Sequence, residues 1–597
     1  MSSDLGTKRE TDIAVALGGR KYDWQRLLKA VCVVAAILAC VALFYKRCYI
    51  GIMDRDSIDI AQIAANISEG HGFTTRFVRP FNALYFKDVS GYYPELNHAP
   101  LFPYIVAILF KLRTVSEQVI VWASLLFFLL TSVATYVLGR LLFDWRVGLL
   151  ATGIFSLSLG ALKAAISGEE WTMCAFLFTL LLCAMASHHT SADTRGGRHG
   201  IACAALSAVL LAALYMTHHI LVILVLPTAM YFAVTGVRRR LYLLVFLGVW
   251  AAAVTPWAVR NGLATGIPVL GASGWDIIAN TSAYPGDTLY RTVELANHSM
   301  MRIILFPTER FAAFVDKLAR GTSGLAQDTM SVIGYFAMAF AVVGMLYRFR
   351  SRSANALRGY LYGALPLMIA CFALFSVDRE AVILFAPLAA VLASAYLLLL
   401  LDAKKLHPFF VNLLVGGLVV LTAFPAFVAA AWPPGGRSLS MATQELNVLL
   451  AGQAFNQNIA TTPVYTDVPW TVAWRTKGVG VWLPVSDQDC QILTGMSLPV
   501  NIILLTPECE SYQPDEIWYA LHRIRVWREY IRDPDRGLDD ILKMAGLTLE
   551  KVPKAPKIVE RILRRFKAAD SVRGFLVARQ DPFAPDYIQV FMRSEAD

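Results

Sequence analysis

Long apolar runs alternate with short polar connections along most of the chain. A helix that crosses a bilayer needs about 20 predominantly apolar residues. Eleven runs come close to that length, at 30–50, 117–139, 147–165, 171–187, 200–216, 219–237, 241–257, 328–347, 359–376, 381–401 and 409–431. The first run is interpreted as an anchor, because it lies far from the start and no small-residue cleavage site follows it. The pattern predicts a polytopic α-helical membrane protein with about eleven spans.

Basic residues predict how these spans are oriented. Lys and Arg precede the first run and return in alternate connections, at Arg140/Arg146, Arg195/Arg198, Arg238–Arg240, Arg348–Arg358 and Lys404/Lys405. Short basic loops stay in the cytoplasm, so residues 1–29 are expected there, in a multi-pass protein of the cell (inner) membrane. The long connections 51–116 and 258–327 then lie on the outer side, where we expect the working surface. An odd number of spans also places the C-terminal region outside, in the periplasm or extracellular space.

Composition agrees with a membrane protein. The chain has 597 residues, of which 56% are hydrophobic and 16% charged, whereas soluble domains carry about a quarter charged residues. The net charge of +10 comes largely from clusters between apolar runs. No basic and aromatic stripe accompanies it, so nucleic acid is excluded as a partner.

The region 433–597 is predicted to be an extracytoplasmic α/β accessory domain that follows a membrane catalytic domain at 30–432. A breaker cluster, Trp432-Pro433-Pro434-Gly435-Gly436, separates the two. Strand-like runs at 463–467, 479–483, 500–506 and 574–579 alternate with helical stretches at 437–455, 514–531, 537–545 and 557–568. Cys490 and Cys509 could pair in an oxidising compartment, but nothing in the sequence places them side by side. No glycine-rich phosphate loop is present, which argues against a nucleotide site.

The first outer loop opens with the candidate catalytic residues, in Asp54-Arg55-Asp56-Ser57-Ile58-Asp59. A carboxylate beside apolar walls can act as a general base, because desolvation raises its pKa towards the working range. The Asp54-x-Asp56 spacing also permits a divalent cation, and simple solvation is the alternative. The next residues have the apolar spacing of an amphipathic interfacial helix that stops at Gly70.

Further polar residues lie at the outward ends of the spans. Ionisable groups at membrane depth are costly and are therefore candidates for function. An Arg fork beside the bilayer is suited to a lipid phosphate. The alternative is that these side chains end helices at headgroup level, and a lone His is more often structural. The candidates for substrate binding are His98, Glu169, Glu170, Arg260, Asn261 and Arg379.

Several short motifs in a fixed order resemble the GT-C class of membrane glycosyltransferases, and within it bacterial relatives of protein O-mannosyltransferases and aminoarabinose transferases. They cover roughly residues 30–400. The motifs are an Asp after the first span, Ala64-x-Asn66-x3-Gly70-x-Gly72, His98-x-Pro100-Leu101-Phe102-Pro103, the Glu170 turn, Pro256-Trp257-x2-Arg260-Asn261, and Arg379 before Pro387.

The resemblance implies an inverting transfer of a sugar from a polyprenyl-phosphate donor to a hydroxyl of a protein, glycan or lipid acceptor. Asp56 would be the base, and Arg379, helped by Arg260, would stabilise the departing lipid phosphate. No nucleotide or other cofactor is implied. Relatives usually have Glu after this Asp, where this chain has Ser57. Asp54 therefore remains the alternative base.

Three other functions are alternatives. An oligosaccharyltransferase-like enzyme would bind a divalent metal at Asp54 and Asp56. A transporter or flippase would show internal repeats and charged or broken helices at mid-membrane, whereas the polar residues here gather at span ends on one side. A non-catalytic scaffold leaves the outer-loop arginines unexplained.

Overall fold

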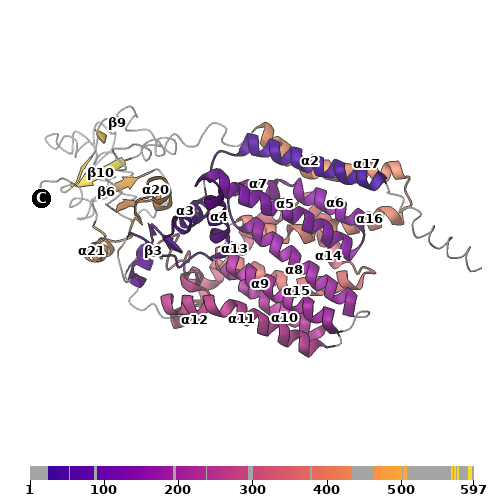
Figure 1. The fold of residues 1–597 in the computed structure, drawn as a ribbon, viewed down its shortest axis with the longest axis horizontal. Coiled ribbons are helices and arrows are strands. Elements are labelled where there is room, and N and C mark those ends of the chain that lie inside the picture. Colours follow the sequence, from indigo (N-terminus) through magenta and orange to yellow (C-terminus); the bar gives the residue numbers. More distant parts are fainter. Residues whose placement is uncertain are drawn as a thin grey trace, which may run out of the picture.

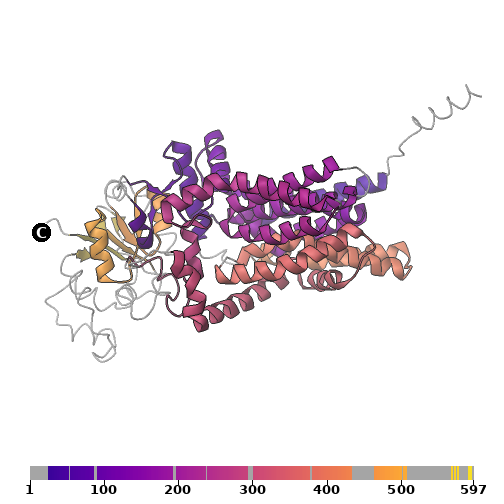
Figure 2. The ribbon, with the colours of Figure 1, turned by 90° about the horizontal axis from the view of Figure 1, so that it is seen from below.

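The protein is an elongated helical bundle with a mixed sheet at one end (Figures 1 and 2). The computed structural model describes residues 24–52, 54–86, 91–192, 197–236, 238–293, 300–376, 379–432, 463–499 and 502–506, together with the short strands at 566–568, 571–572, 575–576 and 589–593.

Eight helices within the described ranges are long and apolar enough to cross a membrane. They are α2 (Trp24–Cys48), α5 (Glu117–Leu142), α8 (Trp171–Ala192), α9 (Gly197–Thr217), α11 (Arg239–Thr265), α15 (Arg352–Leu374), α16 (Ala386–Ala403, extended by the 3-10 turn η4 at Arg379–Phe385) and α17 (Pro408–Ala431). A ninth candidate is bent by 62° between α6 (Trp145–Ser156) and α7 (Leu159–Ser167). The predicted runs 219–237 and 328–347 contain only shorter apolar helices, α10 (Val225–Val234, after η2 at His219–Leu224) and α14 (Tyr335–Leu346). The prediction of a multi-pass membrane protein is confirmed.

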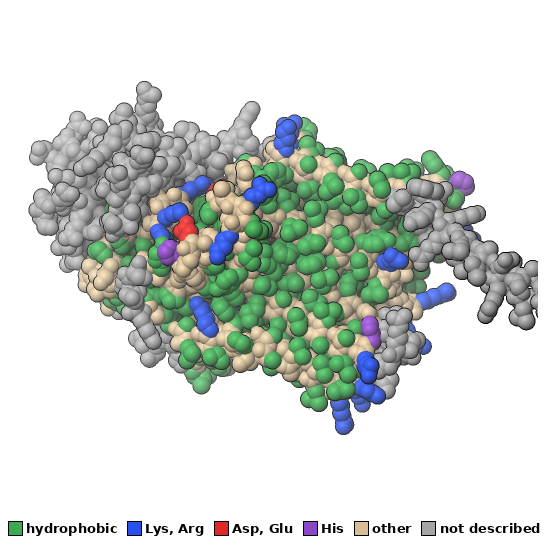
Figure 3. All heavy atoms as spheres, viewed as in Figure 1, with side chains coloured by type: hydrophobic (Ala, Val, Ile, Leu, Met, Phe, Trp, Pro, Cys, Tyr) green, Lys and Arg blue, Asp and Glu red, His purple; other side chains and the backbone are tan. Residues whose placement is uncertain are grey.

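The surface of the bundle is apolar along its length. Figure 3 shows hydrophobic side chains spread over the helices, with Lys and Arg gathered towards the two ends. Large side chains such as Leu244, Val133 and Phe424 are more than half exposed. An apolar surface of this extent is stable only against lipid.

The first outer loop folds as the sequence predicts. Helix α3 (Arg55–Glu69) begins at Asp54, whose side chain accepts a hydrogen bond from the Asp56 N–H. It ends at Gly70, which adopts the left-handed conformation that glycine tolerates best (φ 92°). Helix α3 packs on the short helix α4 (Leu101–Leu112). Strands β1 (Thr74–Thr75) and β3 (Tyr93–Pro94) pair antiparallel and close the loop.

The sheet has six strands in the order β2-β5-β4-β6-β10-β7. They are β2 (Phe77–Val78), β5 (Gly480–Trp482), β4 (Val464–Thr466), β6 (Ile502–Leu505), β10 (Gln589–Arg593) and β7 (Phe566–Ala568). The first four are parallel, and β10 is antiparallel to both of its neighbours. The three strands predicted between 463 and 506 are confirmed. The helix predicted at 557–568 is corrected at its end, because residues 566–568 pair with β10 as a strand.

Two helices of this domain were not predicted, α20 (Pro469–Thr476) and α21 (Asp487–Gly495). The predicted strand at 574–579 is seen as β9 (Phe575–Leu576), which pairs with β8 (Ser571–Val572) outside the main sheet. The helical predictions at 437–455, 514–531 and 537–545 lie outside the described residues. So does Cys509, while Cys490 is buried.

The sheet joins the outer loops to the C-terminal region. Strand β2 belongs to the first outer loop and pairs with β5, some four hundred residues later. The Phe77 ring meets the rings of Trp470 and Trp482 edge-on, at centroid distances of 5.8 and 5.7 Å. In the second long connection, 258–327, the buried Arg291 donates from Nε to the Leu483 carbonyl at 2.7 Å. The sheet therefore holds both long outer loops against the end of the bundle.

Candidate active site

A cavity of about 400 Å³ lies where the outer loops meet the helix ends. We call it the acidic cavity, because five carboxyl side chains line it, those of Asp54, Asp56, Glu170, Asp276 and Asp287. Its wall also includes Arg55, Arg79, His98, His218, Tyr290, Phe375 and Ser376. Four of the candidates predicted from sequence, Asp54, Asp56, His98 and Glu170, are thus brought together from segments distant in the chain.

Asp54 and Asp56 lie at the first turn of α3 but differ in what holds them. The Asp54 carboxylate accepts the Asp56 N–H at 2.8 Å and caps the helix. Burial, and then the charge of Asp56, raise the pKa of Asp54. The Asp56 carboxylate lies 3.8 Å from Arg55 Nε and its side chain is 37% exposed. Asp56 is therefore the carboxylate that is not used for capping.

Arg55, between them, faces the C-terminal domain. Its guanidinium lies 3.3 Å from the Asp287 carboxylate. It also lies over the rings of Trp482 and Trp470, at 4.7 and 5.6 Å from their centroids. Because a cation over an aromatic face is stabilised by the ring quadrupole, these contacts fix the start of α3 against the domain.

A buried ion-pair network supports His98. The Asp59 carboxylate, one turn after Asp56 and fully buried, lies 2.8 Å from an Arg79 nitrogen and 3.1 Å from His98 Nε2. Burial alone would raise the pKa of Asp59, but the Arg79 charge and the His98 hydrogen bond outweigh it and lower that pKa. Burial would lower the pKa of His98, but Asp59 reverses this and raises it above the ordinary value. His98 therefore presents an imidazolium to the acidic cavity at neutral pH.

Glu95 fixes the backbone that carries His98. Its side chain is completely buried, and Oε1 accepts the N–H groups of Asn97 and His98 at 2.7 and 2.9 Å. The Glu95 carbonyl in turn accepts a hydrogen bond from Arg260. His98 is thus held at both its backbone and its ring.

Arg260 and Asn261, predicted to bind substrate, do not line the acidic cavity. Both lie in the last turns of α11, where the Arg260 guanidinium packs over Trp257 at 4.8 Å and donates to Asn261 Oδ1 at 3.1 Å. Asn261 is fully buried. Arg260 holds the Glu95 carbonyl and so the His98 segment, and its contact with substrate stays a prediction.

Of the two carboxyl groups in the Glu169-Glu170 turn, only that of Glu170 lines the acidic cavity. Burial raises the pKa of Glu170 to about 7, although the nearby His98 charge opposes this. Beside it, burial lowers the pKa of His218 to about 4, so that ring is neutral. Glu169 is buried away from the cavity, and its carbonyl accepts from Ser124 Oγ at 2.9 Å. Glu169 does not line the acidic cavity, and its contact with substrate stays a prediction.

Arg379, the remaining candidate, begins η4. Its side chain lies outside the described residues, as does Asp378. The chain reaches η4 directly from Phe375 and Ser376, which line the acidic cavity.

Two titratable residues that the sequence did not indicate are Asp276, which lines the acidic cavity, and Lys317, which contacts the backbone behind it. Burial raises the pKa of Asp276 to about 6, and the Tyr290 hydroxyl donates to its carboxylate. Lys317 donates to the carbonyls of Asp276 and Ala279, and burial lowers its pKa to about 8. No motif links these residues in the sequence, because α13 (Phe311–Val332) approaches η3 (Gly271–Ile277) only in the fold.

The residues at the start of α3 suit a hard divalent cation only in part. Carboxylate oxygens are the ligands that such ions prefer, and Asp54 and Asp56 offer two of them. Within the described ranges, no group of three or more His, Cys, Asp or Glu side chains is arranged to hold a metal ion. Any cation at this pair would take its other ligands from water or substrate.

Known proteins resemble this chain in one segment and in fold. The family model described as dolichyl-phosphate-mannose-protein mannosyltransferase matches residues 97–195, which include His98 and Glu170. No curated protein matches the sequence.

Solved structures match over most of the chain. One is the oligosaccharyltransferase AglB from Archaeoglobus fulgidus in complex with an inhibitory peptide and a dolichol-phosphate, with a TM-score of 0.54, 12% identity, and coverage of 82% of this chain and 71% of that one. The same enzyme in complex with Zn and sulfate matches with a TM-score of 0.53 and 12% identity, and the match covers 79% of this chain and 68% of that one. ArnT from Cupriavidus metallidurans bound to undecaprenyl phosphate matches with a TM-score of 0.47 and 13% identity, and the match covers 81% of this chain and 93% of that one. The chain therefore shares its fold with the AglB structures, and its residues 97–195 resemble the mannosyltransferase family.

Proposed function

We propose that the protein is an inverting glycosyltransferase that moves a sugar from a polyprenyl phosphate to an acceptor hydroxyl at the outer face of the membrane. The observation that carries the proposal is that Asp54, Asp56, His98 and Glu170 line one cavity at the end of the bundle. The family segment at 97–195 supplies two of these residues. The dolichol-phosphate named with AglB supports a lipid-phosphate donor.

Asp56 is the proposed base. Its carboxylate takes the proton of the acceptor hydroxyl, and the oxygen attacks the anomeric carbon from the face opposite the phosphate. The bond from that carbon to the phosphate oxygen breaks, and polyprenyl phosphate leaves with the electron pair, which inverts the configuration. Asp56 is favoured over Asp54 because the Asp54 carboxylate caps α3.

Positive charge is needed where the phosphate departs. His98 supplies it as an imidazolium held by Asp59. Arg379 is proposed as a second cation, since η4 begins three residues after Ser376 of the cavity wall. Glu170 is proposed to bind sugar hydroxyls, because a carboxyl group with a pKa of about 7 can donate as well as accept a hydrogen bond.

A divalent cation at Asp54 and Asp56 is the metal-dependent alternative. Burial and mutual repulsion make two free carboxylates costly there, and zinc is named with AglB. A bound cation would neutralise charge on the departing phosphate. Transfer abolished by EDTA and restored by Mg²⁺ or Mn²⁺ would support this alternative, and undiminished transfer in EDTA would remove it.

The proposed orientation has the N-terminus in the cytoplasm and the sheet domain in the periplasm or extracellular space. Basic residues recur in or beside the connections between α5 and α6, α10 and α11, α14 and α15, and α16 and α17, and Arg146 at the start of α6 pairs with Asp402 at the end of α16 at 3.2 Å. Such a pattern is typical of the cytoplasmic side. Labelling single cysteines introduced at Arg146 and Ser486 with a membrane-impermeant reagent in intact cells tests it. Labelling only at position 486 is expected, and labelling only at 146 would reverse the orientation.

The decisive experiment measures release of polyprenyl phosphate by purified protein in lipid nanodiscs, over a panel of polyprenyl-phosphate sugars. Asp56→Asn should lower the rate by at least about a hundredfold, the smaller contribution expected of a general base. The matched control is Asp402→Asn, an exposed Asp at the opposite end of the bundle. A large loss in Asp54→Asn alone would move the base to Asp54, and normal rates in both variants would reject the assignment.

A further inference from the structure

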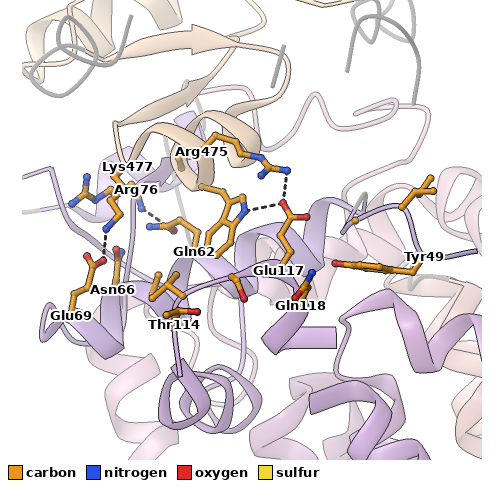
Figure 4. A pocket seen from close by; sticks show the side chains of 17 residues that line it. Tyr49, Gln62, Asn66, Glu69, Arg76, Thr114, Glu117, Gln118, Arg475 and Lys477 are labelled. Carbon is orange, nitrogen blue, oxygen red and sulfur yellow. Dashed lines mark hydrogen bonds and ion pairs between the residues drawn. The ribbon is translucent and has the colours of Figure 1, made fainter. Parts of the chain in front are cut away.

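A second, larger cavity lies between the membrane unit and the C-terminal domain. It has a volume of about 940 Å³, within the range of specific ligand sites. We call it the interdomain cavity (Figure 4). The residues that line it are Tyr49–Gly51, Gln62, Ala65, Asn66, Glu69, Arg76, Thr114–Gln118, Ala473–Arg475 and Lys477. None of them lines the acidic cavity, so the site described above does not account for it.

Two buried donors in its wall lack a partner among the described residues. The Gln62 side chain is 3% exposed, and its Oε1 accepts from Thr75 Oγ1 at 3.1 Å and from the Arg76 N–H at 3.2 Å. These bonds fix the amide and leave Gln62 Nε2 unpaired. Arg76 Nε is likewise unpaired, although its terminal nitrogen donates to Tyr92. Buried polar groups are nearly always hydrogen-bonded, so unpaired donors lining a cavity indicate a ligand or water that accepts from them.

The charges around the cavity largely cancel. Lys477, directly after α20, lies 2.6 Å from the Glu69 carboxylate of α3. Arg475 pairs with Glu117 at the start of α5, whose carboxylate also accepts from Trp474 Nε1 at 3.3 Å. Figure 4 shows both pairs reaching across from α20 to the membrane unit. Arg76 is the remaining cation of the lining, and its guanidinium lies 4.3 Å over the Tyr92 ring. A phosphate or a peptide carboxylate would have to draw Arg76 away from Tyr92 or break one of the two ion pairs.

What remains is a wall suited to hydroxyl groups. Amide and hydroxyl side chains face the cavity from three elements, with Gln62, Asn66, Thr114, Ser116 and Gln118 among them. Two aromatic rings complete it. Trp474 stacks on Phe110 at 6.4 Å and Tyr49 on Tyr45 at 4.9 Å, so both are held in place. The electron-rich face of a fixed ring attracts the polarised C–H groups of a sugar, while amides donate to and accept from its hydroxyls.

Helix α3 connects this cavity to the acidic one. Asp56 lies in its first turn, and Gln62 and Glu69 follow six and thirteen residues later. At a rise of 1.5 Å per residue, these positions are roughly 9 and 20 Å along the helix from Asp56. Because Ser57–Asn66 are buried, a glycan that reached both cavities would pass beside α3 and not along its surface.

We propose that the interdomain cavity binds the preceding sugar units of a neutral glycan acceptor, while its terminal hydroxyl lies at Asp56. This inference rests on the proposed glycosyl transfer and names its acceptor class. The predicted occupant is an oligosaccharide, and neither the lipid phosphate of the donor nor a peptide.

The test is direct binding, without turnover, to purified full-length protein in nanodiscs. The probes are hexasaccharides of mannan, galactan, arabinan and glucan, each compared with its methyl monosaccharide. At least one hexasaccharide should bind at least tenfold more tightly than its monosaccharide.

Trp474→Ala and Gln118→Ala should each weaken that binding severalfold, and Trp474→Phe should restore most of it. The exposed side chain of Gln118 makes its truncation safe for folding. Trp432→Ala, which truncates an exposed Trp at the end of α17, is the matched control.

Several outcomes would overturn the proposal. If no hexasaccharide binds more tightly than its monosaccharide, while Asp56→Asn still abolishes transfer to a short acceptor, the glycan subsite is rejected and the proposed function stands. Displacement of the hexasaccharide by a short-chain polyprenyl phosphate would assign the cavity to the donor. Binding that is unchanged in both Trp474→Ala and Gln118→Ala would place the glycan elsewhere. Absence of any transfer by the unchanged protein, with every donor of the panel, would reject the proposed function itself.

Discussion

Asp59 Oδ2 lies 3.1 Å from His98 Nε2, and the same oxygen lies 2.8 Å from Arg79. Asp59 is fully buried, whereas Arg79 and His98 both line the acidic cavity, and the side chain of His98 is the more exposed of the two. One carboxylate therefore fixes the ring of His98 and also keeps it positively charged.

Replacing Asp59 by Asn should discharge His98. Without the carboxylate, burial is the dominant influence and lowers the pKa of His98 below its ordinary value. The ring would then be neutral at neutral pH, and transfer should fall about a hundredfold, as when one oxyanion donor is removed. The pH above which kcat/KM falls should also shift to a lower value, because in this variant His98 is protonated only at lower pH.

Asp402→Asn again serves as the control for that experiment. A rate that falls in Asp59→Asn with no displacement of the pH profile would mean that Asp59 only maintains the structure. His98→Gln should resemble Asp59→Asn at neutral pH and show no recovery on acidification.

The pH dependence of the transfer rate should include the titration of Glu170. Its pKa is raised to about 7 by burial, so the carboxyl group is protonated below that pH and negative above it. A negative charge beside the donor phosphate is repulsive, and transfer should decline as the pH rises through about 7. Glu170→Gln keeps the group neutral, and its rate should be the same on both sides of that pH. A decline that survives in Glu170→Gln would assign the titration to another group.

Phe77→Ala should loosen the first outer loop from the C-terminal domain. Phe77 is 1% exposed and contacts Trp470 and Trp482. Truncation of a buried Phe costs about 3–5 kcal/mol. The measurement is the thermal unfolding midpoint at a fixed scan rate, with proteolysis of the C-terminal domain as a second readout. Phe311→Ala, which alters a side chain that is 67% exposed, should leave both unchanged.

Gly148→Ala should separate two membrane helices. A Cβ at Gly148 of α6 would lie 2.6 Å from the Tyr136 carbonyl oxygen of α5, and small residues allow such close packing. Overpacking of this kind costs about 1–3 kcal/mol, so the unfolding midpoint should fall. Gly248→Ala in α11 meets nothing within 4 Å, and its midpoint should stay the same or rise. Equal effects in the two variants would contradict the close contact between α5 and α6.

The sequence predicted those features that depend on local patterns. The apolar runs marked the spans, and Gly70 marked the end of α3. Asp54, Asp56, His98 and Glu170 were found because ionisable side chains at span ends are unusual. All four line the acidic cavity.

Features that depend on distant partners were missed. Asp59 follows Asp56 by three residues, but its partners Arg79 and His98 lie 20 and 39 residues away. The contacts of Arg260 with Trp257 and with the Glu95 carbonyl were not predicted either, since they depend on the fold. Strand β2 has only two residues, too few to show alternation.

The pairing of β2 with β5 also sets an order for biosynthesis. The first outer loop is synthesised roughly 400 residues before β5, and domains of a nascent chain form largely in the order of synthesis. Until β5 emerges, the edge of β2 has no neighbour and Arg55 has no Trp482 to pack against. Chains that stop before residue 480 would thus insert their helices yet leave the start of α3 unanchored. Competence for catalysis would arrive only after β5 and Trp482 have been synthesised.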